Sequence, residues 1–159
     1  MAKAKVKKKA NTAEIVNRKA KYEYFKVQEF EAGMQLKGTE VKALRSGNCH
    51  MNDAFCAIEN GELYVRNLYI GEYEFGTINN HEPKRTRKLL MRKPELRKIA
   101  KRVSEKGFTI VPYKVYFTDR GFAKIEIFLA QGKKSYDKRN SIKDRDSKRD
   151  LDRAKKMLN

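Results

Sequence analysis

Short segments in which apolar and polar residues alternate, each ended by turn residues, occupy the middle of this 159-residue chain. Asn60-Gly61 lies between two such segments, 53–58 and 62–68, and this dipeptide in that setting predicts a β-hairpin. Further strands are expected at 22–27, 30–31, 34–37, 108–111, 114–117 and 123–129, with a turn at Ala32-Gly33. A flat sheet of about six such strands would leave its edges exposed. We therefore expect a mainly β fold with short helices, in the form of a closed antiparallel OB-like β-barrel.

Two short helices are expected beside these strands. The first covers 38–47, with Thr39 as its N-cap and Gly47 just beyond its end. The second has Pro94 at its first position and Gly107 at its C-terminal cap. Apolar residues recur along it at helical spacing: Leu96, Ile99, Ala100 and Val103. A stripe of this kind is expected to face the core.

Positive charge dominates the composition. The chain has 38 Lys and Arg against 20 Asp and Glu, which gives a formal net charge of +18. Such an excess usually indicates a nucleic-acid partner, with an anionic membrane surface as the alternative. No apolar stretch approaches the roughly 20 residues of a membrane span, and the Lys-rich start lacks the apolar segment of a signal peptide. We therefore expect a cytoplasmic protein that binds RNA and does not associate with a membrane.

The composition changes sharply after residue 131 and divides the chain. Residues 1–12 are expected to be a disordered basic arm, residues 13–131 the OB-like RNA-binding barrel, and residues 132–159 a basic C-terminal tail. The larger apolar side chains of the tail are few: Ile142, Leu151, Met157 and Leu158. Such a segment cannot bury enough apolar surface to offset its ordering entropy. We expect the tail to be disordered in the free protein.

The tail nevertheless has the charge pattern of a marginal helix. An acid precedes a base at i,i+3 or i,i+4 spacing in three pairs: Asp144–Lys148, Asp150–Arg153 and Asp152–Lys156. This order of charges favours a helix. The tail is therefore expected to become helical on an anionic partner.

Cysteine and histidine offer no framework for a disulfide or a metal. Cys49 and Cys56 do not have the spacing of a CxxC motif, and we expect them to be reduced, with one or both in the core. Together with His50 and His81 they would give adjacent, irregularly spaced ligands, which argues against zinc. We also find no nucleophile–base set or phosphate-cradling glycine loop. The chain is expected to be a non-enzyme without a cofactor or metal.

Five blocks of the sequence, in order, resemble the small protein B family, the SsrA-binding (tmRNA-binding) proteins of bacterial trans-translation. The blocks are 17–20 with 24–25, 30–33, 38–42 with 44–45, 85–90, and 132–134 with 137–139. Each block alone is weak evidence, but all five in this order and spacing are strong evidence. Met91 stands where the family usually has Leu, and Tyr136 where some members have His; neither change removes a charge.

The resemblance implies an OB-type barrel that binds the tRNA-like domain of tmRNA (SsrA RNA) and accompanies it with elongation factor Tu to a stalled ribosome. It also implies that the tail enters the empty mRNA channel at the decoding centre of the small subunit. The expected tmRNA-binding residues are Asn17, Arg18, Lys19, Glu31, Arg45, Lys84, Arg85, Arg87, Lys88 and Lys124. The expected ribosome-binding residues of the tail are Gly132, Lys133, Lys134, Tyr136, Asp137, Lys138, Arg139, Lys143, Arg145, Arg149 and Arg153.

Some of these residues also admit a structural interpretation. The cluster of Arg85, Arg87 and Lys88 could be a solvated surface, although like charges this close favour an anionic partner. Glu31 could pair with a nearby arginine or accept hydrogen bonds from RNA base edges or hydroxyls. Tyr136 could be incidental to the tail or could stack on a ribosomal base.

Two other functions stay open at this point. One is a small basic ribonuclease that uses His50 or His81 with Glu31 and Lys124, which predicts RNA cleavage by the purified protein. The other is a structural ribosomal protein, which predicts a fixed stoichiometry on all ribosomes. Sedimentation separates the ribosomal protein from a tmRNA-binding adaptor, whose occupancy of ribosomes should follow tmRNA. Sequencing the RNA that co-purifies from cells is the most informative single experiment.

Overall fold

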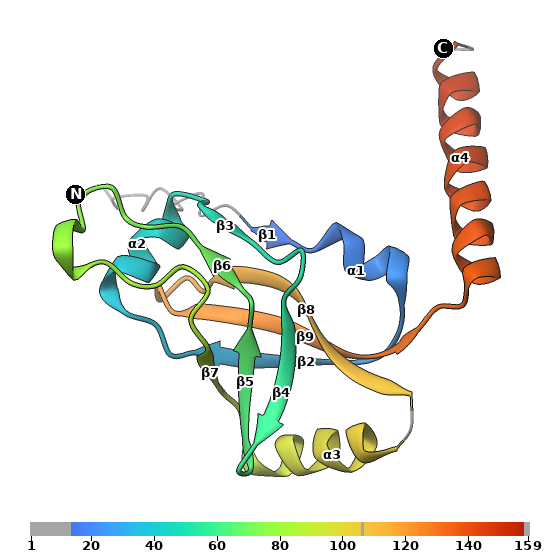
Figure 1. Ribbon diagram of the computed structural model, residues 1–159. Helices are drawn as coiled ribbons and strands as arrows, with labels where there is room; N and C mark the ends of the chain where they lie inside the picture. The colour runs from blue at the N-terminus through green and yellow to red at the C-terminus, as the bar shows by residue number, and fades with distance from the viewer. Residues whose placement is uncertain (1–13, 106, 158–159) are drawn as a thin grey trace, which may run out of the picture.

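Six antiparallel strands pair into a closed ring in the computed structural model of the protein, which describes residues 14–105 and 107–157 (Figure 1). In their order around the ring, these strands are β8 (Phe108–Phe117), β4 (Phe55–Glu59), β5 (Glu62–Arg66), β7 (Arg87–Leu90), β2 (Tyr24–Met34) and β9 (Ala123–Gly132). The ring closes because β9 pairs with both β2 and β8. Strand β1 (Ile15–Val16) also pairs with β8, and β3 (Cys49–His50) pairs with β6 (Tyr69–Ile70) in a separate ladder.

Helices account for the rest of the regular structure. They are α1 (Arg18–Glu23), α2 (Gly38–Arg45), the short 3-10 helix η1 (Thr77–Asn79), α3 (Lys93–Ser104) and α4 (Ser135–Met157). The fold is therefore mixed α and β, because α4 alone contributes 23 helical residues. The expectation of a mainly β protein was wrong on this point, while the closed antiparallel arrangement was correct. Within the described residues, no helix is long and apolar enough to cross a membrane.

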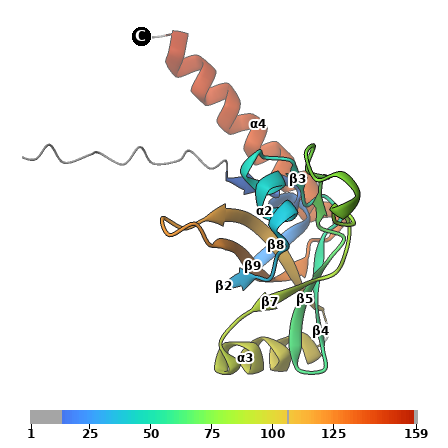
Figure 2. The same ribbon diagram turned by 90° about the vertical axis from the view of Figure 1, so that its left-hand side faces the viewer.

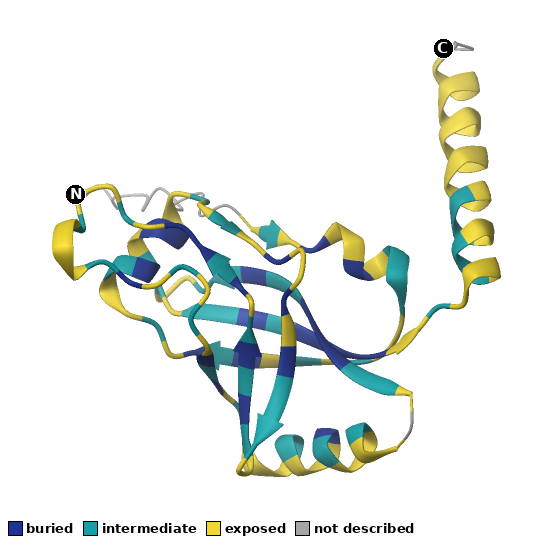
Figure 3. Ribbon diagram, in the orientation of Figure 1, coloured by how far each residue is buried: buried dark blue, intermediate teal, exposed yellow. Residues whose placement is uncertain are grey.

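The core fills the inside of the ring (Figure 3). Inward-facing residues of the strands are fully buried, among them Val65, Ile125 and Ile127. Leu44 of α2 and Ile99 of α3 join the same core. The apolar stripe expected on the second helix is thus confirmed, and α3 covers part of the ring with it.

The turn at Asn60-Gly61 has the backbone that its sequence predicts. Both residues have positive φ, 50° for Asn60 and 75° for Gly61. Two successive positive values are the requirement of a type I′ turn, which asparagine and glycine tolerate better than other residues. The flanking strands β4 and β5 pair from Glu59↔Glu62 to Phe55↔Arg66.

The expected turn at Ala32-Gly33 was wrong, because β2 continues through it as one strand. Gly33 pairs with Leu90 of β7 on one side and with Lys124 of β9 on the other. Ladders on both edges outweigh the local turn preference of a glycine. The expected N-cap of α2 was also wrong: Lys37 takes that position, and the Thr39 hydroxyl lies 2.9 Å from His81 Nδ1.

The tail is a helix in this structure, so the expected disordered tail was wrong. Helix α4 projects away from the ring (Figure 1). Ion pairs join Asp146 to Arg149 at 3.9 Å and Asp150 to Arg153 at 3.7 Å, and the latter is one of the pairs expected from helical spacing. The composition correctly indicates that the segment buries little, but such pairs and good helix formers favour a helix without burial. The expected basic arm at residues 1–12 lies outside the described residues.

Candidate nucleic-acid interface

The outer face of β2, β9 and β8 holds a trio of side chains, Glu31, Lys124 and Tyr116. Lys124 lies directly opposite Tyr116 in the β8–β9 ladder, and its ammonium pairs with the Glu31 carboxylate of β2. Hydrogen bonds from Lys124 and Tyr116 lower the pKa of Glu31 below its usual value. The carboxylate is therefore charged near neutral pH, and its structural partner is a lysine, where an arginine was the alternative.

Tyr116 was not among the expected site residues. Burial, followed by its hydrogen bond to Glu31, raises the pKa of Tyr116 to about 12, so the phenol keeps its proton and remains a donor. The residue lies on the outward face of an alternating strand, like many surface residues. The short turn between β8 and β9 brings Tyr116 next to Lys124, but the pairing of β9 with β2, which adds Glu31, has no local sequence signal.

Acidic side chains surround the trio on one side. A hollow of about 470 Å³ is lined by Glu14, Glu29, Phe30, Glu31, Lys114, Tyr116 and Glu126. Carboxylates repel phosphates but accept hydrogen bonds from the amino groups of bases and from ribose hydroxyls. This part of the face is therefore suited to base edges and sugars more than to the phosphate backbone.

A second hollow, of about 590 Å³, opens on the other side of the Glu31–Lys124 pair. It is lined by Glu31, Ala32, Gly33, Leu90, Met91, Arg92, Glu95 and Lys124. Here Arg92 adds a positive charge and Leu90 an exposed apolar side chain. Of these lining residues, the sequence had indicated only Glu31 and Lys124 as RNA contacts.

Arg45 lies at the same end of the ring, beside the loop that joins β8 to β9. Its guanidinium carbon is 5.5 Å from the centre of the Phe117 ring. The guanidinium also lies against Gly121, where an added Cβ would come within 3.5 Å of Arg45 Nη2. The structure thus places Arg45, an exposed cation, next to the strand ends that carry the trio.

Arg87 has a structural position, contrary to its expected contact with RNA. Its side chain is fully buried, and its Nε donates to Glu40 Oε1 at 2.7 Å. The guanidinium also donates to the backbone carbonyls of Leu68 at 2.5 Å and Pro83 at 2.9 Å. Because every one of these bonds points inward, Arg87 presents no charge at the surface, and we no longer count it as a direct contact.

Glu40 of α2 holds Arg85 as well. Arg85 donates from Nη2 to Glu40 Oε2 at 2.6 Å, and the amide of Lys37 donates to the same oxygen at 2.6 Å. Burial alone would raise the pKa of Glu40, but hydrogen bonds from Arg85, the Lys37 amide and Arg87 outweigh it and lower the pKa. The charge of Arg85 is therefore largely neutralised by Glu40, whereas Lys84 is exposed.

Lys88 forms the same kind of trio as Lys124, on a different part of the ring. Its ammonium pairs with Glu62, and the Tyr64 hydroxyl donates to Glu62 at 2.7 Å. This Glu62–Lys88–Tyr64 trio lies on β5 and β7. Sequence alone could not distinguish the two lysines, because the acidic partner of each comes from another strand.

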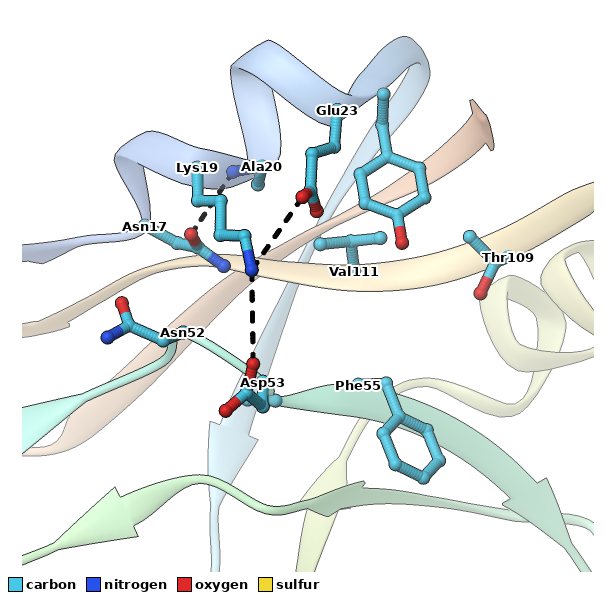
Figure 4. A pocket seen from close by; sticks show the side chains of 11 residues that line it. Asn17, Lys19, Ala20, Glu23, Asn52, Asp53, Phe55, Thr109 and Val111 are labelled. Atoms are coloured by element: carbon cyan, nitrogen blue, oxygen red, sulfur yellow. Dashed lines mark hydrogen bonds and ion pairs between the residues drawn. The ribbon is translucent and has the colours of Figure 1, made fainter. Parts of the chain in front are cut away.

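The expected residues at the start of α1 divide between the inside and the surface. Asn17 is buried and caps the helix: its Oδ1 accepts from the Ala20 amide at 3.1 Å, and its Nδ2 donates to the carbonyls of Met51 and Pro112. Arg18 is exposed. Lys19 pairs with Glu23 at 3.7 Å and with Asp53 at 4.0 Å over a hollow of about 270 Å³ (Figure 4).

The tail residues lie on and just before α4. Lys133 Nζ is 5.0 Å from the centre of the Phe25 ring, beside a hollow of about 350 Å³ that Lys21, Tyr113 and Phe128 also line. The Lys134 amide donates to Asp137 Oδ2 at 3.2 Å, so Asp137 stabilises the start of the helix. The following residues are exposed: Lys134, Tyr136, Arg139, Lys143, Arg145, Arg149 and Arg153. Gly132 is exposed, and Lys138 is half-buried.

The ribonuclease alternative requires a histidine next to Glu31 and Lys124, but both histidines contact other residues. His81 is buried between Thr39 and the Ile70 carbonyl, which its Nε2 meets at 3.0 Å. His50 stacks on Tyr69 with ring centres 4.4 Å apart. A ring buried as His81 is cannot reach a polymer substrate, so this alternative loses one of its two candidate histidines.

The cysteines and possible metal ligands give no catalytic site. Both cysteines are free thiols, and burial raises the pKa of Cys49 to about 12 and raises the pKa of Cys56 as well. Thiols with raised pKa values are unreactive at neutral pH. Across residues 14–105 and 107–157, no three His, Cys, Asp or Glu side chains are grouped to hold a metal ion.

Comparison with known proteins gives consistent matches over most of the chain. The family model of SmpB protein matches residues 14–157. The SsrA-binding protein of Desulforamulus reducens is 54% identical over 138 residues, which cover 87% of this chain and 86% of that protein. The SsrA-binding protein of Parabacteroides distasonis is 48% identical over 145 residues, 91% of this chain and 95% of that protein.

A solved structure, described as "tmRNA-SmpB: a journey to the center of the bacterial ribosome", contains a similar chain. The sequence identity is 48% and the TM-score is 0.66. The match covers 77% of this chain and 85% of that chain.

Proposed function

This chain belongs to the SmpB protein family, and we propose that it is an SsrA-binding protein that acts with tmRNA in ribosome rescue by trans-translation. It works as a non-enzymatic RNA-binding adaptor in the cytoplasm of a bacterium. The observation that carries the proposal from the structure is the outward trio of Glu31, Lys124 and Tyr116 at the end of the ring where Arg45 lies. We take the closed ring as an OB-like barrel, a fold that commonly binds nucleic acid on one face and its loops.

The chemistry of this face suits a folded RNA. Glu31 accepts hydrogen bonds from base amino groups or 2′-hydroxyls, while Lys124 and Arg45 neutralise nearby phosphates. Since Glu31 and Lys124 hold each other in place, their side chains lose little freedom on binding. Lys19, Arg18 and Lys84 are exposed and supply further positive charge around the body.

The body and the tail have different roles in this proposal. The ring binds the tRNA-like domain of tmRNA, and elongation factor Tu joins the delivery complex. Helix α4 reaches the small ribosomal subunit and occupies the vacant decoding site and mRNA channel. The support for this role is that α4 projects from the ring with exposed cations along its length, so that it offers charge to an RNA-walled channel (Figure 1).

The test compares two matched substitutions, Glu31→Gln and Glu62→Gln. Both carboxylates pair with one lysine and one tyrosine, but only Glu31 lies on the proposed face. A hydrogen bond to a charged group contributes about 1.5–3 kcal/mol, so Glu31→Gln should weaken binding of the tRNA-like RNA by about tenfold to a hundredfold. Glu62→Gln should bind within about twofold of the unchanged protein, in a gel-shift titration at fixed salt.

Equal affinity of the two variants would move the binding face away from β2 and β9. A protein that binds no tRNA-like RNA at all would overturn the function itself. Sequencing of RNA that co-purifies from cells supplies the independent check, because one dominant tRNA-like species is expected.

A further inference from the structure

Phe122 is an exposed aromatic residue in a firmly held loop. It ends the connection between β8 and β9, and 67% of its surface is exposed. Two hydrogen bonds fix its backbone: Phe122 N donates to Thr118 Oγ1 at 3.1 Å, and Thr118 N donates to the Phe122 carbonyl at 3.0 Å. A third bond, from Gly121 N to the Thr118 carbonyl at 2.8 Å, closes the turn. The ring is thus held outside the core on a fixed backbone. Figure 2 shows this hairpin projecting from the body, away from β4 and β5.

Three basic side chains and one acidic side chain, Asp119, lie in the loop of Phe122 or beside it. Gly121, the preceding residue, lies against the guanidinium of Arg45. Lys124 lies two residues further along the chain, near the start of β9. Arg120, on the other side, is exposed. An aromatic ring with cations on its flanks is the arrangement by which proteins hold a single-stranded base, because the ring stacks on the base and the cations hold the backbone.

Two residues that are even more exposed lack this setting. Phe75 is 77% exposed and Ile78 is 97% exposed, but their loop carries Glu72 and Glu74. Carboxylates beside an aromatic ring repel the phosphates on both sides of a base. Exposure together with neighbouring cations therefore favours Phe122 over Phe75 and Ile78. Phe25 also has a cationic neighbour, but it is less exposed, at 46%, and Lys133 already lies over its ring.

We propose that Phe122 stacks on an unpaired base of the RNA that the Glu31–Lys124 face binds. The inference rests on the proposed function and adds to it one aromatic anchor and one feature of the ligand, an unstacked base within reach of Lys124. A stacked base is recognised by its face, so the contact tolerates any base and adds affinity more than sequence preference.

The absence of tryptophan from the chain allows a direct test. Phe122→Trp introduces a single indole at the proposed contact, and Phe75→Trp introduces one in the acidic loop as the control. Titration with the tRNA-like RNA should quench the fluorescence of Phe122→Trp, with the same midpoint as a gel-shift titration. The fluorescence of Phe75→Trp should change little under the same conditions.

Affinity measurements give a second, independent readout. Phe122→Ala and Phe122→Leu should each weaken binding by about tenfold, whereas Phe122→Tyr should retain it, because only tyrosine keeps a ring that stacks. Each variant should melt within a few degrees of the unchanged protein, since the ring is outside the core.

Two results would overturn the inference while leaving the proposed function in place. One is RNA binding that leaves the Phe122→Trp fluorescence unchanged, and the other is full affinity in Phe122→Leu. A failure of the unchanged protein to bind the RNA would overturn both.

Discussion

Arg87 and Glu40 form a fully buried ion pair that ties strand β7 to helix α2. The guanidinium also satisfies the carbonyls of Leu68 and Pro83, in the segments that connect β5 to β7. A buried charge is tolerated only when its partners are complete. The pair therefore fixes how the chain returns to β7, and with it the position of the strand beside β2.

Arg87→Ala should destabilise the protein by about 3–5 kcal/mol, because it removes the fully buried charged partner of the Glu40 carboxylate and leaves two carbonyls unpaired. Lys88→Ala, next to Arg87 in the chain, breaks a solvent-screened pair with Glu62 and should leave the stability nearly unchanged. Urea unfolding monitored by circular dichroism measures both. If Arg87→Ala kept its stability and lost RNA affinity instead, Arg87 would be a direct contact after all.

The sequence could identify the charged residues of the candidate site but not which of them face outward. Arg85, Arg87 and Lys88 form one basic cluster in the sequence, yet only tertiary pairing decides that Arg87 turns inward to Glu40, 47 residues away. The same holds for Tyr116, whose contact with Glu31 depends on the order of the strands. Charge and motif are local properties, whereas burial and partner choice are not.

Helix α3 connects to the core through one fully buried side chain, Ile99. Leu96 and Val103 lie on the same side and are partly buried against the core. The exposed side of the helix carries basic residues such as Lys98 and Arg102. This segregation follows the helical period of the sequence, which explains why the helix and its core face were both predictable.

Ile99→Asp should lower stability by several kcal/mol, because the new carboxylate has no partner in the core and must be desolvated. Lys98→Asp, at the adjacent exposed position, is the control for an aspartate in this helix and should cost about 1 kcal/mol or less. Thermal melting distinguishes the two variants. A small change in the melting temperature of Ile99→Asp would mean that α3 does not cover the ring.

Elements with local signals were predictable, and elements that depend on distant pairing were not. The Asn60-Gly61 turn and the α3 stripe each have a sequence pattern of their own. Helix α1 has one local signal, the Asn17 cap, but its six residues are too few for an apolar period, and Asn17 is held by the distant carbonyls of Met51 and Pro112. For α4, the spacing of charges indicates a helix, whereas the small number of apolar residues led us to expect disorder in the free protein.

At the scale of the whole molecule, two bodies of different chemistry are joined at one place. The ring has a continuous apolar core, whereas α4 is exposed along most of its length. The ladder between β2 and β9 ends at Tyr24↔Gly132, and the Lys133 amide donates to the Glu23 carbonyl at 2.9 Å. Removal of α4 therefore breaks no contact of the core.

A chain that ends after Gly132 should fold and melt near the temperature of the full protein. It should bind the tRNA-like RNA with at most about tenfold loss, since only peripheral positive charge is removed. Tagging of nascent chains on stalled ribosomes should fall to background in a reconstituted translation assay. The full-length variant with Asp137, Lys138 and Arg139 all changed to Ala should have the same defect.

Normal tagging by the shortened chain would contradict a role for α4 on the ribosome. Loss of RNA binding by the shortened chain would instead locate part of the recognition surface in the tail.

Helix α4 is joined to the ring through a short junction at Gly132 and Lys133, so a small rotation there displaces its far end. At a rise of roughly 1.5 Å per residue, its 23 residues extend about 35 Å from the point where the backbone leaves β9. A rotation of about 10° in the few dihedral angles between β9 and Ser135 would then displace the far end of the helix by roughly 6 Å, without disturbing the ring. The direction of the helix axis is consequently set by very few residues. Lys133 is the residue that determines it, because its amide donates to the Glu23 carbonyl and its side chain lies over Phe25.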